Sequence, residues 1–146
     1  MSFRVLLLLS GLAAVACNGP MGLMSGGKLD GEVRPLPASW ASLGESGQMQ
    51  FETRPAQPYS VNVNYTIFDG KLYVNAGTTE TKWAQNIAAN PLVRLRIDGA
   101  LYELRAERVT DAVEIASFGK VWARQSIFLR DPAQFEEVWL YRMAPR

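Results

Sequence analysis

The stretch TKWAQNIAANP, residues 81–91, lies between segments whose side chains alternate between apolar and polar, as they do in β-strands. Ala84 and Ile87 recur at helical spacing, so we predict a short helix that packs one face against the strands. The Asn90-Pro91 pair ends this helix, because a residue before proline is disfavoured in the α-helical region. One short helix inserted into a strand-rich chain is the feature that decides the fold.

Two predicted hairpins flank this helix. The segment YSVNVNYTIF, residues 59–68, places aromatic and aliphatic side chains on one face and serine, asparagine and threonine on the other. Asp69-Gly70 follows, and KLYVNAG then alternates again, which is typical of a hairpin with a type I′ turn. The segments PLVRLRI and ALYELRAERVT repeat this arrangement around Asp98-Gly99.

The rest of the chain adds two strands and one helix. QMQFETR (48–54) and EEVWLYRMAP (136–145) alternate like strands, while residues 111–125 are compatible with a helix that Asp111 caps. We expect coil with one short strand near Trp40. About six mostly antiparallel strands with few helices predict a small closed or partly closed β-barrel.

The N-terminus has the pattern of a secretory signal. Residues 1–16, MSFRVLLLLSGLAAVA, contain one charge, Arg4, then an apolar run and an Ala-x-Ala exit. Cys17, the single cysteine, follows directly, so two routes stay open: ordinary signal peptidase, or lipoprotein signal peptidase with lipidation of Cys17. The segment resembles a bacterial lipobox, with Ala14 where leucine is usual.

Processing would leave a neutral chain with no reason to bind nucleic acid. Loss of Arg4 leaves 14 basic residues (15 − 1) against 14 acidic ones. We therefore expect three parts: a signal peptide at 1–16, a lipidated cysteine with a flexible, glycine-rich tether at 17–31, and one domain at 32–146. The expected location is the cell envelope, with acyl chains holding the protein to a membrane. Asn18 favours the periplasmic face of an outer membrane, by analogy with bacterial lipoproteins.

The segment Asp69–Asp111 resembles the split β-barrel superfamily of flavin-binding proteins, which includes pyridoxamine phosphate oxidases and deazaflavin-dependent nitroreductase-like proteins. The residues that match its pattern are Gly77, Lys82, Trp83, Asn86, Ile87, Asn90 and Pro91. The resemblance implies a mainly β, six-stranded antiparallel split β-barrel, a homodimer, and FMN or a deazaflavin as cofactor of an oxidoreductase.

Six residues are candidates to hold that small-molecule cofactor. Thr78, Thr79 and Lys82 cluster at the start of the helix, where amides, hydroxyls and an ammonium bind phosphate. By the resemblance, Trp83 packs or stacks beside the ring, and Asn62 bonds its edge. Arg54 stands where deazaflavin-binding relatives carry a more basic loop.

Each of these residues also has a purely structural interpretation. Lys82 can be a solvated lysine on a capped helix, Arg54 a turn residue beside Pro55, and Asn62 part of an ordinary outward strand face. Asn86 can serve the fold by bonding nearby polar groups.

The chain contains no histidine, which excludes histidine-dependent triads and most zinc sites. Any redox chemistry would belong to a cofactor. The signal lacks a twin-arginine pair and so predicts unfolded export, which requires a flavin to be acquired outside the cytoplasm. Two functions remain: a flavin- or deazaflavin-binding oxidoreductase-like lipoprotein, or a non-catalytic envelope module that keeps the barrel without a cofactor.

Overall fold

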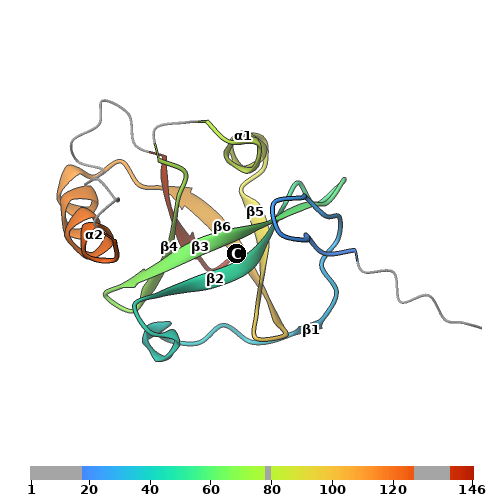
Figure 1. Cartoon of the computed structure of the whole chain (residues 1–146), viewed down its shortest axis with the longest axis horizontal. Coiled ribbons are helices and arrows are strands. Elements are labelled where there is room, and N and C mark those ends of the chain that lie inside the picture. The colour runs from blue at the N-terminus through green and yellow to red at the C-terminus, as the bar shows by residue number, and fades with distance from the viewer. Residues whose placement is uncertain (1–17, 78–79, 127–138) are drawn as a thin grey trace, which may run out of the picture.

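The computed structural model describes residues 18–77, 80–126 and 139–146. Within these ranges the chain is mainly β (Figure 1). The strands are β1 (Glu32–Val33), β2 (Ser46–Thr53), β3 (Tyr59–Phe68), β4 (Lys71–Asn75), β5 (Leu92–Ile97), β6 (Ala100–Arg108) and β7 (Leu140–Ala144). The helices are α1 (Lys82–Ala89), α2 (Ala112–Arg124) and the 3₁₀ turn η1 (Ala41–Leu43).

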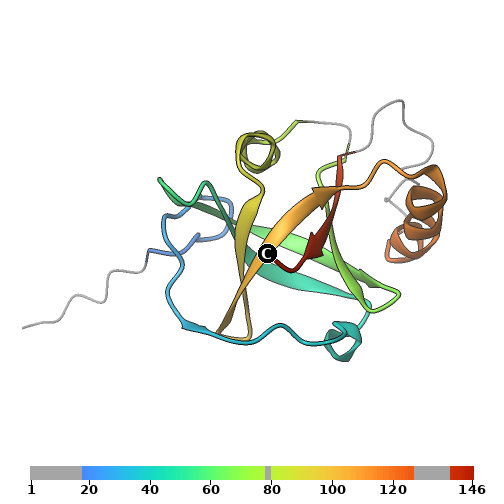
Figure 2. The same ribbon diagram turned by 180° about the vertical axis from the view of Figure 1, so that it is seen from behind.

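Six of the strands form a closed antiparallel barrel in the order β6-β5-β2-β3-β4-β7. The ring closes where β7 pairs with the second half of β6, from Arg105 opposite Ala144 to Arg108 opposite Tyr141 (Figure 2). The short strand β1 lies outside the ring and pairs in parallel with the first half of β6. The predicted six-stranded antiparallel barrel is confirmed.

Both predicted hairpins turn as the Asp-Gly pairs require. The φ angles are 50° at Asp69 and 67° at Gly70, and 50° at Asp98 and 80° at Gly99. Positive φ at both central residues is the conformation that a type I′ turn needs.

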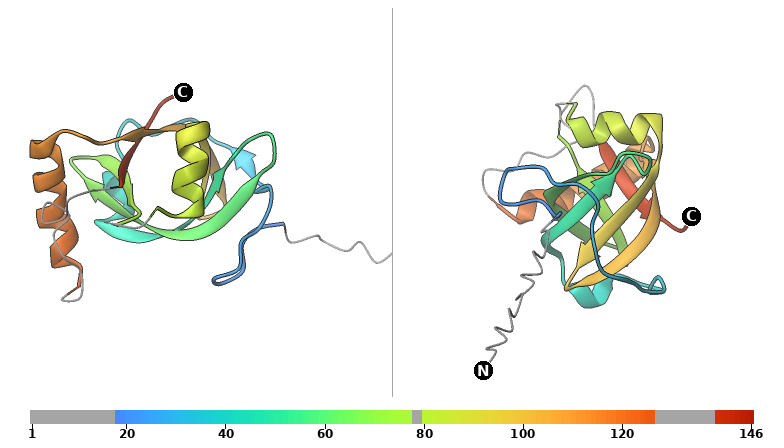
Figure 3. Two further views of the ribbon diagram at one scale, coloured as in Figure 1. Left: turned by 90° about the horizontal axis from the view of Figure 1, so that it is seen from above. Right: turned by 90° about the vertical axis from the view of Figure 1, so that its right-hand side faces the viewer.

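Helix α1 lies across one end of the barrel (Figure 3) and packs against β2 and β3. The hydroxyl oxygen of Thr81 caps its start by accepting a bond from the Ala84 amide at 3.4 Å, and Asn90 ends it. Helix α2 lies outside the barrel wall, and Asp111 caps it as predicted, with the Glu114 amide donating to its carboxylate at 2.7 Å.

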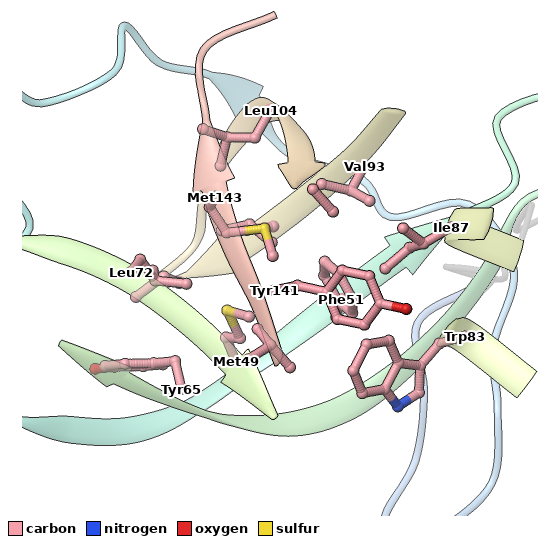
Figure 4. Close-up of a cluster of buried hydrophobic side chains, with 14 of the residues drawn as sticks. Met49, Phe51, Tyr65, Leu72, Trp83, Ile87, Val93, Leu104, Tyr141 and Met143 are labelled. Carbon is pink, nitrogen blue, oxygen red and sulfur yellow. The ribbon is translucent and has the colours of Figure 1, made fainter. Parts of the chain in front are cut away.

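The barrel interior is filled by side chains, so it is a packed core (Figure 4). Trp83 enters this core from α1 and meets Phe51 edge-on at 5.5 Å and Tyr141 at 5.7 Å between ring centroids. The other labelled members of the cluster are Met49, Tyr65, Leu72, Ile87, Val93, Leu104 and Met143.

Two N-terminal regions differ from expectation. Trp40 lies in the core and is followed by η1, and the short strand sits earlier, at β1. Residues 18–31, predicted to be a flexible tether, pack on the barrel: Leu29 is 1 % exposed, and Gly26 pairs with the β3 backbone at Ser60. Buried backbone groups need partners, and the outer face of the strands supplies them, so residues 18–31 belong to the packed unit.

Candidate functional site

The residues expected to hold a cofactor phosphate are only partly described. Lys82 is exposed in the first turn of α1. Thr78 and Thr79 lie outside the described residues. The phosphate interpretation of this loop therefore stays a prediction.

Trp83 points inward from α1 and is 7 % exposed. Its ring contacts are Phe51 and Tyr141, both core residues (Figure 4). Two roles were expected for Trp83: packing, or stacking on a cofactor ring. In the structure its side chain packs in the core.

Arg54 belongs to the turn between β2 and β3. Its φ is 58°, its Nε donates to the Gln57 carbonyl at 2.7 Å, and its guanidinium lies 6.0 Å from the centre of the Tyr59 ring. These contacts are those of the turn-residue interpretation, because they tie the arginine to its own loop.

Asn62 bonds to the chain's own N-terminal segment. Its Nδ2 donates to the Gly22 carbonyl at 3.0 Å, and beside it the buried Ser60 hydroxyl donates to the Gly27 carbonyl at 2.7 Å. The N-terminal segment thus covers this part of the outer β3 face.

Asn86 serves the fold. Its Nδ2 donates to the Thr53 hydroxyl at 3.0 Å, and that hydroxyl donates to the Tyr59 carbonyl at 3.4 Å. Both side chains are buried, so this chain of bonds fixes α1 to the ends of β2 and β3.

A neutral cleft lies between the β2–β3 hairpin and α2. Its volume is about 450 Å³, and none of its described lining residues carries a charge. Gln48 and Asn64, which are directly opposite each other on β2 and β3, form its floor. The lining residues are Ser46, Gly47, Gln48, Asn64, Trp122, Gln125 and Ser126.

One wall of this cleft carries an aromatic ring. Trp122 is half-buried and stacks on Phe118, with ring centroids 5.8 Å apart and planes at 25°. On the same wall the Gln125 amide bonds to the buried Thr66 hydroxyl at 3.2 Å. This wall belongs to α2 and its C-terminal cap, so it is held in position by the stacking within α2 and by the bond to β3.

Sequence reasoning did not find this cleft. The polar face of β3 was recognised, and the matching amides in QMQ at residues 48–50 were visible. Two further facts were missing: that Gln48 pairs with Asn64, and that α2 packs alongside. Register and helix placement are tertiary properties, so only the alternation of amides with apolar residues signalled the face.

A second cleft, of about 390 Å³, is lined by charged side chains. Its carboxylates are bonded by arginines of the same cleft. Glu52 accepts two bonds from Arg94 at 3.0 Å and one from the Leu29 amide at 2.5 Å. At its edge Arg146 lies 3.3 Å from Glu103 and bonds the Val93 carbonyl at 3.2 Å. These arginines hold the N- and C-terminal segments, so they do not form an open phosphate site.

Among the described residues, the pKa that is shifted most belongs to Tyr73, which lies on β4 and bonds Glu114 of α2. Burial raises its pKa, and the bond that it donates to Glu114 at 2.7 Å raises it further. Arg142 bonds the same carboxylate at 2.7 Å and Glu107 at 3.0 Å, which ties α2 to β6 and β7. This network has a structural role, because its groups bond one another.

Other kinds of site find no support in the part of the chain that is described. In residues 18–77, 80–126 and 139–146 there is no group of three or more histidine, cysteine, aspartate or glutamate residues placed to bind a metal. No helix in the same ranges is long and apolar enough to cross a bilayer.

No family model matches the sequence, and no curated protein is significantly similar to it.

Proposed function

We propose that this chain is an exported, lipid-anchored and non-catalytic binding module of the cell envelope. Its ligand site is the neutral cleft between the β2–β3 hairpin and α2, and its ligand is a neutral, hydrogen-bonding molecule such as a glycan. The observation that carries the proposal is the lining of that cleft, in which amides and hydroxyls surround one partly exposed indole.

The chemistry of the lining favours that class of ligand. An amide donates and accepts hydrogen bonds at once, as a sugar hydroxyl does, and Gln48 and Asn64 place two amides side by side. The Trp122 ring offers an apolar face on which the C–H face of a sugar packs. A charged ligand would find no countercharge among the described lining residues.

The candidate cofactor residues support a module without a flavin. Asn62 is bonded by the N-terminal segment, Arg54 by its own turn, and Trp83 is in the core. A bound flavin ring would have to displace the first of these contacts within the same chain.

The test is a titration of the protein with short, neutral oligomers of N-acetylglucosamine, followed by tryptophan fluorescence. We expect saturable binding that Asn64→Ala weakens about tenfold, which corresponds to about 1.4 kcal/mol. Gln57→Ala is the matched control, since Gln57 is an exposed amide residue outside the cleft. Absence of binding to neutral oligosaccharides, or equal affinities of the two variants, would refute the assignment of this cleft.

A second candidate is the flavin or deazaflavin site that the resemblance implies, completed by a second copy of the chain. Lys82, exposed at the start of α1, is the observation that favours it. In addition, this edge of β3 pairs with β4 only from Thr66 to Phe68 and with the N-terminal segment only at Ser60 among the described residues, which leaves the stretch between them as an edge where a homodimer partner can pack.

Titration with FMN, then with a deazaflavin, separates the two candidates. Saturable binding that Lys82→Ala weakens by about 1–3 kcal/mol, the cost of losing a charge-assisted bond, would favour the oxidoreductase. Lys71→Ala, at an exposed lysine of β4, is its control. Binding that is unchanged in both variants would remove Lys82 from any cofactor site.

A further inference from the structure

The N-terminal segment forms a small hairpin with a fixed base. Met21 and Met24 exchange backbone bonds of 3.1 and 2.9 Å around Gly22, whose φ is 55°. Below them the Gly27 amide donates to the Asn18 carbonyl at 2.7 Å. The two arms are in close contact, because a Cβ on Gly26 would lie 2.4–2.6 Å from backbone atoms of residues 18–20.

This base is attached to the barrel. Gly26 and Ser60 exchange backbone bonds of 2.8 and 2.9 Å, and Asn62 bonds the Gly22 carbonyl at 3.0 Å. The hairpin therefore holds a defined direction relative to the barrel, which a flexible tether would not.

The tip of this hairpin is apolar. Leu23 is fully exposed, and Met21 and Met24 are 57 % and 62 % exposed. Residues 18–27, NGPMGLMSGG, contain no charged side chain, and Lys28 is the first charged residue after them. Three exposed apolar side chains on a fixed, uncharged tip mark an interaction site.

The hairpin projects from the barrel wall at the side away from α2, as the blue segment in Figure 3 shows. Cys17 immediately precedes its base at Asn18, and the apolar run of residues 5–9 precedes Cys17. Any attachment of the chain to a bilayer through this end would bring the tip to the bilayer surface.

We propose that the Met21–Met24 tip inserts into the membrane interface beside the lipid anchor and so fixes the orientation of the barrel on the membrane. The proposal rests on the proposed anchoring through Cys17. A tip of three side chains is too small for a stable protein interface, which buries about 1,200–2,000 Å². Insertion into a lipid interface needs only apolar side chains and no complementary surface.

The test supplies the anchor chemically, so that it does not depend on lipidation in cells. All of the described structure lies within residues 18–146, and the processed chain from Cys17 onward keeps Cys17 as its single thiol. That thiol is coupled to maleimide lipid in phosphatidylethanolamine–phosphatidylglycerol vesicles. The photo-crosslinker benzoylphenylalanine replaces Leu23 in one sample, Ser25 in a second and Val113 in a third.

Ser25 is an exposed control on the same hairpin, and Val113, 73 % exposed on α2, is a distant control. We expect lipid adducts at position 23 to exceed those at position 113 at least tenfold, and those at position 25 severalfold. Equal yields at positions 23 and 25 would mean that the adducts reflect only the closeness of the hairpin to the bilayer. That result would overturn the proposal. Adducts between position 23 and a second protein chain would also overturn it, in favour of a protein contact.

A separate fractionation of cells distinguishes failure of the anchor from failure of the tip. If the Cys17→Ser chain stays in the membrane fraction as the native chain does, lipidation of Cys17 is refuted. The vesicle result then still decides the role of the tip.

Discussion

The ion pair between Glu52 and Arg94 should contribute more to stability than any exposed pair of the barrel. Both side chains are largely buried, at 5 % and 14 % exposure, on the outer face of β2 and β5 beneath the N-terminal segment. Arg94 donates both to the Glu52 carboxylate and to the Leu29 carbonyl, while the Leu29 amide donates to Glu52. Two side chains thus fasten Leu29 to the barrel wall.

Glu52→Gln keeps the shape of the side chain and removes its charge. The amide has one acceptor oxygen where the carboxylate has two, so either the Arg94 Nε–H loses its acceptor, or the Leu29 amide and an Arg94 Nη2–H both do. Removal of one partner of a buried pair costs about 3–5 kcal/mol, because the other charge stays buried without compensation. Since small domains have total stabilities of about 5–15 kcal/mol, the variant should be close to the limit of folding.

Urea unfolding followed by tryptophan fluorescence measures this loss. With a slope of about 1–3 kcal/mol per molar urea, the midpoint should fall by roughly 1–5 M. Glu103→Gln is the matched control: its partner Arg146 lies at 3.3 Å, both side chains are more than a third exposed, and its loss should stay below about 1 kcal/mol.

Limited trypsin digestion reports the local effect. Lys28 is exposed, but Leu29 after it is buried, so cleavage of the bond between them should be slow in the native chain and fast in Glu52→Gln. A loss below about 1 kcal/mol with unchanged cleavage at Lys28 would refute the argument that this pair clamps the N-terminal segment.

Three further perturbations test individual contacts. Gly47→Ala should cost about 1–3 kcal/mol in urea unfolding, because its Cβ would lie 2.4 Å from the Tyr65 hydroxyl oxygen; an unchanged midpoint would contradict that contact. Asp111→Ala should cost about 1 kcal/mol and reduce helical circular dichroism, since it removes the cap that accepts the Glu114 amide. The protonated Tyr73 hydroxyl, whose pKa is raised above 10.0, contributes stability that is complete below that value and is lost at higher pH. Between about pH 9 and about pH 11, the free energy of unfolding should therefore fall less in Tyr73→Phe than in the native chain. An equal fall in both proteins would contradict the raised pKa of Tyr73.

Local signals account for most of the fold that the sequence predicted. The Asp69-Gly70 and Asp98-Gly99 turns, the alternation in β3 and the Asn90 stop each depend on residues close together in the chain. Such signals are readable because they determine backbone conformation directly. The sequence predicted a barrel in general, but it did not predict that the barrel closes between β6 and β7. That closure depends on pairing between segments that are distant in the chain.

The same reasoning failed where polar groups find partners far away in the sequence. Residues 18–31 have a composition typical of a tether, but Leu29 is held by Glu52 and Arg94, 23 and 65 positions away. Arg94 resembled an outward strand residue, because alternation says which face a side chain occupies and nothing about what covers that face. Asn62 was predicted to contact a ligand, but its side-chain amide donates to the Gly22 carbonyl.

The two proposals about location and ligand constrain each other. The hairpin tip and helix α2 lie at opposite ends of the molecule (Figure 1), and the neutral cleft is bounded by α2 at Trp122. The blue hairpin and the C-terminal end of α2 point to the same side of the barrel in the left view of Figure 3. If the tip rests on the bilayer, the α2 wall of the cleft therefore lies on the membrane side of the barrel, where a ligand exposed at the membrane surface can reach it. Because the base at Gly26 and Ser60 fixes the hairpin to β3, this placement does not depend on a loose tether.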